Sequence, residues 1–225
     1  MEPSAKATPV DLYKALRKKL TTCPLTHVDF LPLDILQEVI TVDSIRAYAG
    51  RNSNPELLSD LADSAEEVLF NTKKVYASLV FIQRQSAFGA LLSEGLIDED
   101  LPLSRHSDTS TDVLCCRNGI KTFETFQGWS SFETDIYLEK QYHLLAPVFD
   151  IPGRHFDLSP NFALPLTPMR EEIVKISNSR VYKCAIYPAH YPHGAKVSAK
   201  STISDLVEGV RLIIKGTGRP SSGSN

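Results

Sequence analysis

Apolar side chains recur at intervals of three and four residues through most of the first hundred positions, and this spacing constrains the fold more than any other feature of the sequence. Leu12, Leu16 and Leu20 would line one face of a helix. A second pattern begins after Pro32 and continues to Gly50, so we expect one helix there. The sequence therefore predicts that this part of the chain is built from helices.

Two further helices are predicted in the same region. Asn54, Pro55 and Glu56 have the character of an N-cap, a first-turn proline and an acidic residue that suits the positive end of the helix dipole. The longest periodic pattern covers residues 73–92, and Gly95 stands where that helix should end. We expect a bundle of about four helices.

The pattern changes after residue 97. Residues 98–117 are rich in acidic residues, Ser and Thr, which predicts a surface loop or hinge. Ser130 and Glu133 have the spacing of a capping box, so we expect a helix that begins there and ends at Pro147. Residues 147–168 contain five prolines, which favours an extended segment that wraps over a neighbouring surface.

The last third of the chain has strand-forming character. Residues 172–176 and 180–187 are rich in β-branched and aromatic residues, and the short polar segment 177–179 joins them, which predicts a β-hairpin. From residue 203 to 214 apolar residues return with helical spacing, which predicts an amphipathic helix. The fold class that we predict is therefore mainly α, and α+β overall.

These patterns divide the chain into four parts. We expect a helical bundle at 1–97, then a loop, a tryptophan-bearing helix and a proline-rich wrap at 98–168. The hairpin and the last helix make up 169–215, and we expect a disordered tail at 216–225.

Composition narrows the classes of function. Hydrophobic residues make up 42% and charged residues 23% of the chain, which is typical of a globular protein. The net charge of −3 and the short basic runs argue against nucleic acid or an acidic membrane surface as partner, so we expect a protein partner. The sequence shows no signal peptide and no transmembrane stretch, and its four cysteines are scattered. We therefore expect the protein in the cytoplasm or the nucleus.

Five short elements follow one another between residues 98 and 190. They are Asp-Glu-Asp-Leu-Pro at 98–102, the segment 126–129 with Trp129, Gln-Tyr-His-Leu-Leu-Ala-Pro-Val-Phe at 141–149, Leu-Pro at 164–165, and Val-Tyr-Lys-Cys-Ala-Ile-Tyr-Pro-Ala-His at 181–190. Their order and spacing resemble a protein-kinase-like family of filamentous fungi, in which a helical leader precedes the kinase N-lobe. The resemblance covers about half of the chain and implies that the hairpin is the beginning of a partial kinase-like N-lobe.

The resemblance also implies where a nucleotide would be held. It places the three glycines of a kinase phosphate-covering loop at Val174, Ile176 and Ser179, and none of these is glycine. Side chains at these positions would obstruct the close approach of backbone to phosphate, so the loop is degenerate. The candidate ATP-contacting lysine is Lys200, in Val-Ser-Ala-Lys at 197–200, and the other interpretation is a solvated lysine.

Phosphoryl transfer needs further residues that this sequence lacks. No string like His-Arg-Asp or Asp-Phe-Gly, which supply the base and the magnesium ligands, occurs in the 225 residues. We therefore expect a truncated, inactive member of the family with a regulatory or interaction role. No cofactor is expected, and ATP with magnesium would apply only to a longer product, which would be a serine/threonine kinase. The alternative is a self-contained helical interaction module with no kinase relationship.

Two pairs of residues carry chemistry that could be functional. His190 and His193 could ligate a metal, but zinc needs two more ligands at matched spacing, so we interpret them as surface histidines and expect no metal site. Cys115 and Cys116 could be redox active, but a reactive thiol needs an electropositive environment, so we interpret them as ordinary thiols.

Three further constellations have both a functional and a structural interpretation. Ser130 or Ser131 with His143 and Asp150 supplies the residue types of a catalytic triad, but no nucleophile elbow surrounds either serine. Trp129 and three nearby phenylalanines could form a stacking platform, but aromatic residues at this spacing more often anchor a core. The apolar face of the predicted last helix would pack on the hairpin or enter a partner's groove.

Overall fold

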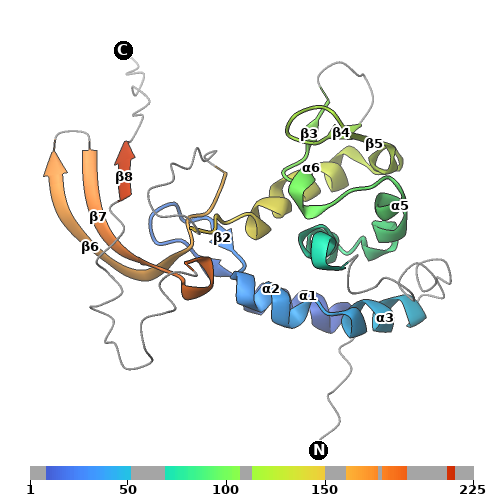
Figure 1. Ribbon diagram of the computed structural model, residues 1–225, viewed down its shortest axis with the longest axis horizontal. Helices are drawn as coiled ribbons and strands as arrows, with labels where there is room; N and C mark the ends of the chain where they lie inside the picture. The colour runs from blue at the N-terminus through green and yellow to red at the C-terminus, as the bar shows by residue number, and fades with distance from the viewer. Residues whose placement is uncertain are drawn as a thin grey trace, which may run out of the picture.

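The computed structural model describes residues 9–51, 69–106, 113–149, 161–176, 179–191 and 212–215. These residues form an α+β protein in which helices are accompanied by three small antiparallel sheets. In Figure 1 the largest sheet, which is the last of the described sheets along the chain, extends from one side of a body that contains the helices and a second small sheet. Within these ranges, no helix combines the length and the apolar character needed to cross a membrane.

The first elements form as their apolar spacing predicts. Helix α1 (Pro9–Lys18) buries Leu12 and Leu16, which confirms the predicted face. Two short strands, β1 (Thr21–Thr22) and β2 (Asp29–Phe30), pair antiparallel and return the chain to α1. Helix α2 then packs against α1.

The prediction of a single helix between Pro32 and Gly50 is wrong. The structure has α2 (Leu33–Val39) and α3 (Val42–Arg51). The side chains of Thr41 and Ser44 each accept a hydrogen bond from the other's backbone N–H, at 3.2 and 3.0 Å, and so cap the start of α3. This reciprocal cap starts a new helix in the middle of one apolar pattern. The helix predicted to begin at Asn54 lies outside the described residues.

The long pattern at 73–92 is likewise divided. A helix occupies residues 69–81, and the chain then turns at Gln83, whose φ is +58°. A 3-10 turn, η1 (Gln85–Ala87), leads into α5 (Phe88–Ser93). The turn lets Phe88 pack edge-to-face on Tyr76, with the ring centroids 4.9 Å apart.

Gly95 ends α5 as predicted. Its φ of +75° is in the left-handed region, which glycine adopts without a steric penalty. Its N–H donates to the Leu92 carbonyl at 2.9 Å, and the N–H of Leu96 donates to the Leu91 carbonyl at 3.0 Å. These two bonds form a Schellman motif, and Leu91 and Leu96 are both fully buried.

The prediction of a surface loop at 98–117 is wrong in its described parts. The 3-10 turn η2 (Asp98–Asp100) is followed by β3 (Ser104–Arg105), which joins β4 (Leu114–Cys115) and β5 (Thr122–Phe123) in the order β3-β4-β5. Within this segment four apolar residues belong to the main core, namely Leu101, Leu103, Leu114 and Cys116. Polar composition concealed a segment that contributes alternate apolar residues to the core.

Helix α6 (Ser131–Lys140) follows a 3-10 turn, η3 (Glu124–Gly128). The predicted capping box is confirmed, because Ser130 Oγ accepts from the Glu133 N–H and the Glu133 carboxylate accepts from the Ser130 N–H. The α-helix ends at Lys140, earlier than predicted, and continues only as a 3-10 turn, η4 (Gln141–Leu144).

The predicted hairpin is confirmed and is longer than the sequence indicated. Strand β6 (Leu166–Ile176) pairs antiparallel with β7 (Ser179–Ile186), and a 3-10 turn, η5 (Pro188–His190), follows. The register shifts between Leu166 and Arg170, where Pro168 offers no N–H to the ladder.

The predicted last helix is wrong at its described end. Leu212–Lys215 form strand β8, which pairs antiparallel with β7 and gives the order β6-β7-β8. A short apolar run rich in isoleucine fits a strand as well as a helix, and pairing with β7 satisfies the backbone groups on one edge of that strand. Residues 201–211 of that prediction, and the predicted tail, lie outside the described residues.

One hydrophobic core joins the segments on either side of residue 97. It extends from Leu12 to Leu145 and includes residues from α1, α2, the helix at 69–81, β4 and α6. Its largest fully buried side chains include Tyr76, Phe88, Phe126 and Tyr137. The predicted parts 1–97 and 98–168 therefore contribute to the same core.

Candidate functional site

The closed end of the β6–β7 hairpin carries the three positions that the sequence analysis assigned to a phosphate-covering loop. Val174 pairs with Val181, and Ile176 pairs with Ser179, which is the last pair before the turn. Strand β8 brings Lys215 into register with Ser179. The backbone therefore brings positions 174, 176, 179 and 215 to the same end of one sheet.

Lys215 is a residue that the sequence analysis missed. The apolar spacing of Leu-Ile-Ile-Lys at 212–215 predicts a helix, whereas the structure places Lys215 at the end of strand β8. The available signal was three large apolar residues followed by lysine, directly before a glycine. Lys200, the predicted lysine, lies outside the described residues.

Gln141, the first residue of the element at 141–149, binds the residue that directly follows the acidic element at 98–102. Its side chain is fully buried, and its amide oxygen accepts from the Leu103 N–H at 2.8 Å, while its amide nitrogen donates to the Leu103 carbonyl at 2.9 Å. The side-chain amide thus bonds both the N–H and the carbonyl of one residue, as the backbone of a neighbouring β-strand does. This pair fixes the segment after Pro102 against the end of α6.

His190 connects three further segments. Its Nε2 accepts from the Leu33 N–H at 3.1 Å, and its Nδ1 lies 3.0 Å from the Pro147 carbonyl oxygen. Its own carbonyl accepts from the Phe149 N–H at 2.8 Å. The side chain is only 3% exposed, so the interpretation of His190 as a surface histidine is wrong. His193 lies outside the described residues.

The acidic turn at Asp98–Asp100 fastens the helix at 69–81. The Asp98 carboxylate accepts from the backbone N–H groups of Lys74 and Val75, at 3.1 and 2.9 Å. Partial burial raises the pKa of Asp98 to about 6, although these two amides act in the opposite direction. Asp100 accepts from Lys121 Nζ at 3.0 Å, which joins the turn to the segment leading into β5.

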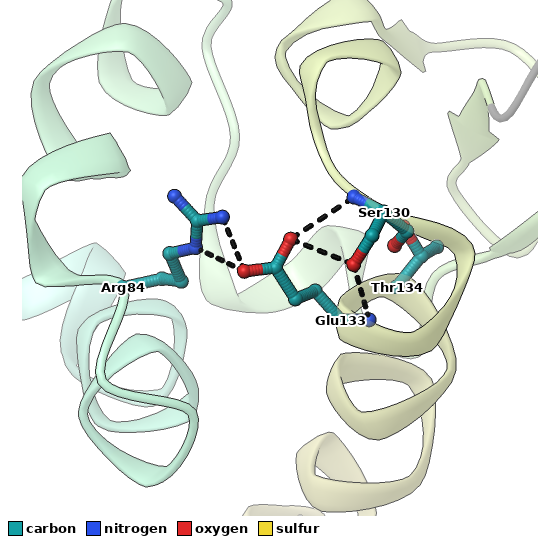
Figure 2. Close-up of polar contacts among 4 residues, drawn as sticks. All are labelled: Arg84, Ser130, Glu133 and Thr134. Carbon is teal, nitrogen blue, oxygen red and sulfur yellow. Dashed lines mark hydrogen bonds and ion pairs between the residues drawn. The ribbon is translucent and has the colours of Figure 1, made fainter.

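A polar cluster on the helical core links the turn after residue 81 to α6 (Figure 2). Arg84 forms an ion pair with Glu133, in which Nε donates to Oε1 at 2.8 Å. Figure 2 shows the other carboxylate oxygen of Glu133 bonded to Ser130. The Ser130 N–H, followed by Arg84, lowers the pKa of Glu133. The Arg84 guanidinium also lies 5.8 Å from the centre of the Trp129 ring.

A pocket of about 710 Å³ opens beside Gln141. It lies between residues 27–29, 103–105 and 138–143. Its two long basic side chains are already paired, since Arg105 contacts Asp135 at 2.8 Å and Lys140 contacts Glu139 at 2.7 Å. The pocket therefore offers no concentrated charge for a strongly ionic ligand.

The remaining candidate residues have structural roles where they are described. Cys115 and Cys116 are buried and free. Ser130 caps α6, and His143 Nδ1 hydrogen-bonds the Asp29 carbonyl at 2.9 Å, whereas Asp150 lies outside the described residues. The described residues contain no group of three or more His, Cys, Asp or Glu side chains that could hold a metal ion.

The aromatic residues near Trp129 are core anchors with one exception. Phe123, Phe126 and Trp129 are buried, and the Phe126 and Trp129 rings meet with centroids 4.7 Å apart. The prediction that Phe132 anchors the core is wrong, because this residue is 72% exposed on the first turn of α6.

Comparison with protein-family models, with curated proteins and with solved structures finds no match to this chain.

Replacing Gln141 with leucine removes the hydrogen-bond partners of both backbone groups of Leu103, the N–H and the carbonyl, inside the core. We expect Gln141→Leu to lower the free energy of unfolding by about 3 kcal/mol, because each unsatisfied buried backbone group costs about 1–3 kcal/mol. Urea denaturation followed by Trp129 fluorescence measures this. Gln127→Leu changes an exposed glutamine in the same way and serves as the matched control. Equal stability of the two variants would contradict the role of Gln141.

Asp98 gives the stability a defined dependence on pH. Its pKa is about 6 in the folded protein and 3.8 in an unfolded reference, so the folded state holds more protons between these values. Acidification from pH 7 to 4 should therefore stabilise the wild-type protein relative to Asp98→Asn, by on the order of 2–3 kcal/mol. Urea denaturation at several pH values measures the difference, with Glu99→Gln as the control for net charge. If the stability of the wild-type protein relative to Asp98→Asn decreased as the pH falls, the raised pKa of Asp98 would be contradicted.

Proposed function

We propose that this chain is a non-catalytic, protein-kinase-like protein with a regulatory or interaction role. On this proposal the helical core is the leader of the family and the β6–β8 sheet is the beginning of a kinase N-lobe. The observation that carries it is the position of Lys215 at the closed end of the hairpin, where β8 brings it beside Ser179. The strand order differs from that of a kinase N-lobe, whose third strand pairs with the first, because β8 pairs with β7. A kinase N-lobe places a lysine of its third strand near the loop that covers the phosphates.

The arrangement of the five sequence elements also supports the proposal. Gln141 binds the backbone of Leu103, directly after the acidic element, and His190 binds the backbone of Pro147 and Phe149. The Leu-Pro element contributes the Pro165 carbonyl, which accepts from Tyr187 N–H at 2.7 Å. Three of the elements, at 141–149, 164–165 and 181–190, are thus joined by hydrogen bonds, and the first of these three also binds the residue after the acidic element. These bonds give a physical reason for these elements occurring together.

Within the proposal, Lys215 replaces Lys200 as the residue that corresponds to the nucleotide lysine. The non-catalytic character rests on two separate features of the sequence. Val174, Ile176 and Ser179 stand where close approach to phosphate favours glycine, and the 225 residues contain no string that resembles His-Arg-Asp or Asp-Phe-Gly. We therefore propose no reaction and no bound nucleotide for this chain.

A second candidate function is a helical interaction module with no kinase relationship. The observation in its favour is that the helical core is continuous from Leu12 to Leu145 and carries three exposed large apolar side chains, Phe70, Ile120 and Phe132. On either proposal the partner is a protein. The three described cysteines are buried and free, which suits a reducing compartment such as the cytoplasm or the nucleus.

Nucleotide binding separates the two candidates. We expect Mg-ATP to leave the melting temperature of the wild-type protein unchanged, because the loop positions carry side chains. A variant with Val174→Gly, Ile176→Gly and Ser179→Gly should gain a melting-temperature shift at millimolar Mg-ATP, because its backbone amides can then approach phosphate. Adding Lys215→Ala to that variant should remove the shift, while Lys200→Ala should leave it.

A clear shift in the wild-type protein would contradict the degenerate loop. No shift in the triple-glycine variant, with the amide spectrum of the sheet intact, would contradict the kinase-like lobe and favour the helical interaction module.

A further inference from the structure

The β6–β8 sheet is attached to the rest of the protein by one end only among the described contacts. The start of β6 and the end of β7 pack into a small cluster in which Leu166 and Cys23 are buried. A second small cluster surrounds Phe30 and includes Tyr187. The closed end, where Ile176 pairs with Ser179, is the opposite end of the hairpin. Polar contacts at this end therefore help to hold the sheet against the rest of the protein.

His190 is the residue at this attachment where three segments meet. The Leu33 N–H is at the start of α2, where Pro32 occupies the N-cap position without a side-chain hydrogen bond. The first N–H groups of a helix need an external acceptor, and His190 Nε2 supplies one at 3.1 Å. The Phe30 ring lies edge-on to the imidazole, with centroids 5.7 Å apart. The imidazole therefore acts as a remote cap for α2.

The two contacts of the ring fix its protonation state. A carbonyl oxygen only accepts, so Nδ1 must carry the proton that faces Pro147 at 3.0 Å. A backbone N–H only donates, so Nε2 must be unprotonated where it faces Leu33. A second proton on the ring would sit on Nε2, and this new N–H would point at the backbone N–H of Leu33, so that two donors would face each other. The attachment is therefore compatible only with neutral imidazole.

We infer that His190 is a proton-sensitive joint, whose protonation at Nε2 breaks the contact with Leu33 and releases the β6–β8 sheet from the start of α2. The inference does not depend on the kinase-like proposal, because it concerns how the sheet is held and not what the sheet binds. It adds a conformational response to acid that neither candidate function requires.

The surroundings of His190 favour this response. Burial lowers the pKa of His190 below its ordinary value of 6.5, so the neutral form is retained in the closed joint. The hydrogen bond to the Pro147 carbonyl and the charge of Asp34, on α2, act in the opposite direction and raise the pKa of His190. Lys74, from the helix at 69–81, lowers the pKa and so opposes protonation. Burial and the charge of Asp34 raise the pKa of Tyr187 above its ordinary value of 10, so its phenol stays uncharged throughout the range in which His190 titrates.

The sign of the pH dependence follows from these directions. The released histidine binds a proton near pH 6.5, whereas the closed joint binds it only at lower pH. Acidification below pH 6.5 therefore favours release, by about tenfold per pH unit until the closed joint is itself protonated.

Amide hydrogen exchange of the full chain, measured by NMR at pH 7.5 and 5.5, tests the joint. After correction for intrinsic exchange rates, we expect protection of the Leu33, Phe149 and Tyr187 amides to fall several-fold at the lower pH. Amides of the main core, such as Leu96 and Thr134, should keep their protection. The glutamine amide in His190→Gln supplies a donor and an acceptor without titrating, so this variant should show no such change.

The matched control is His143→Gln, which removes another histidine and should retain the wild-type response. His190→Asn provides a second non-titrating variant if His190→Gln does not fold. Three results would overturn the inference: unchanged protection of the three joint amides in the wild-type protein, a pH response that persists in the non-titrating variant, or a parallel loss of protection in the main core.

Discussion

The neutral imidazole of His190 is the contact on which the arrangement of the last third of the structure depends. It joins the start of α2, the segment after η4 and the end of the β6–β7 hairpin through one donor and one acceptor. Beside it lie two small apolar clusters, which within the described part of the chain bury Cys23 with Leu166, and Phe30 with Ala146 and Ala163. A buried polar group with both partners satisfied fixes one geometry, because any other leaves a donor or an acceptor unpaired.

The helical core uses the same principle at two other positions. Gln141 pairs with both backbone groups of Leu103, and Asp98 accepts from two backbone amides of the helix at 69–81. In each case a polar side chain fastens an irregular segment to a regular one. Apolar burial provides most of the stability of such a core, while these polar pairs determine which segments meet.

The sequence predicted elements whose signals are local. The capping box at Ser130, the stop at Gly95 and the hairpin each depend on a few adjacent residues, and the structure confirms all three. It did not predict the polar contacts of Gln141 and His190, because their partners are 38 and 157 residues away in the sequence. Periodicity alone also failed to distinguish strand from helix in the run that ends at Lys215.

The protonation state of one ring tests this account most directly. NMR of histidine ring nitrogens in the wild-type protein identifies which nitrogen of His190 carries the proton and follows its titration. The account predicts a neutral ring protonated at Nδ1 at pH 7, with a pKa below the ordinary 6.5. A ring protonated at Nε2, or a pKa above 6.5, would contradict the role of His190 as acceptor for Leu33 and with it the joint between sheet and helices.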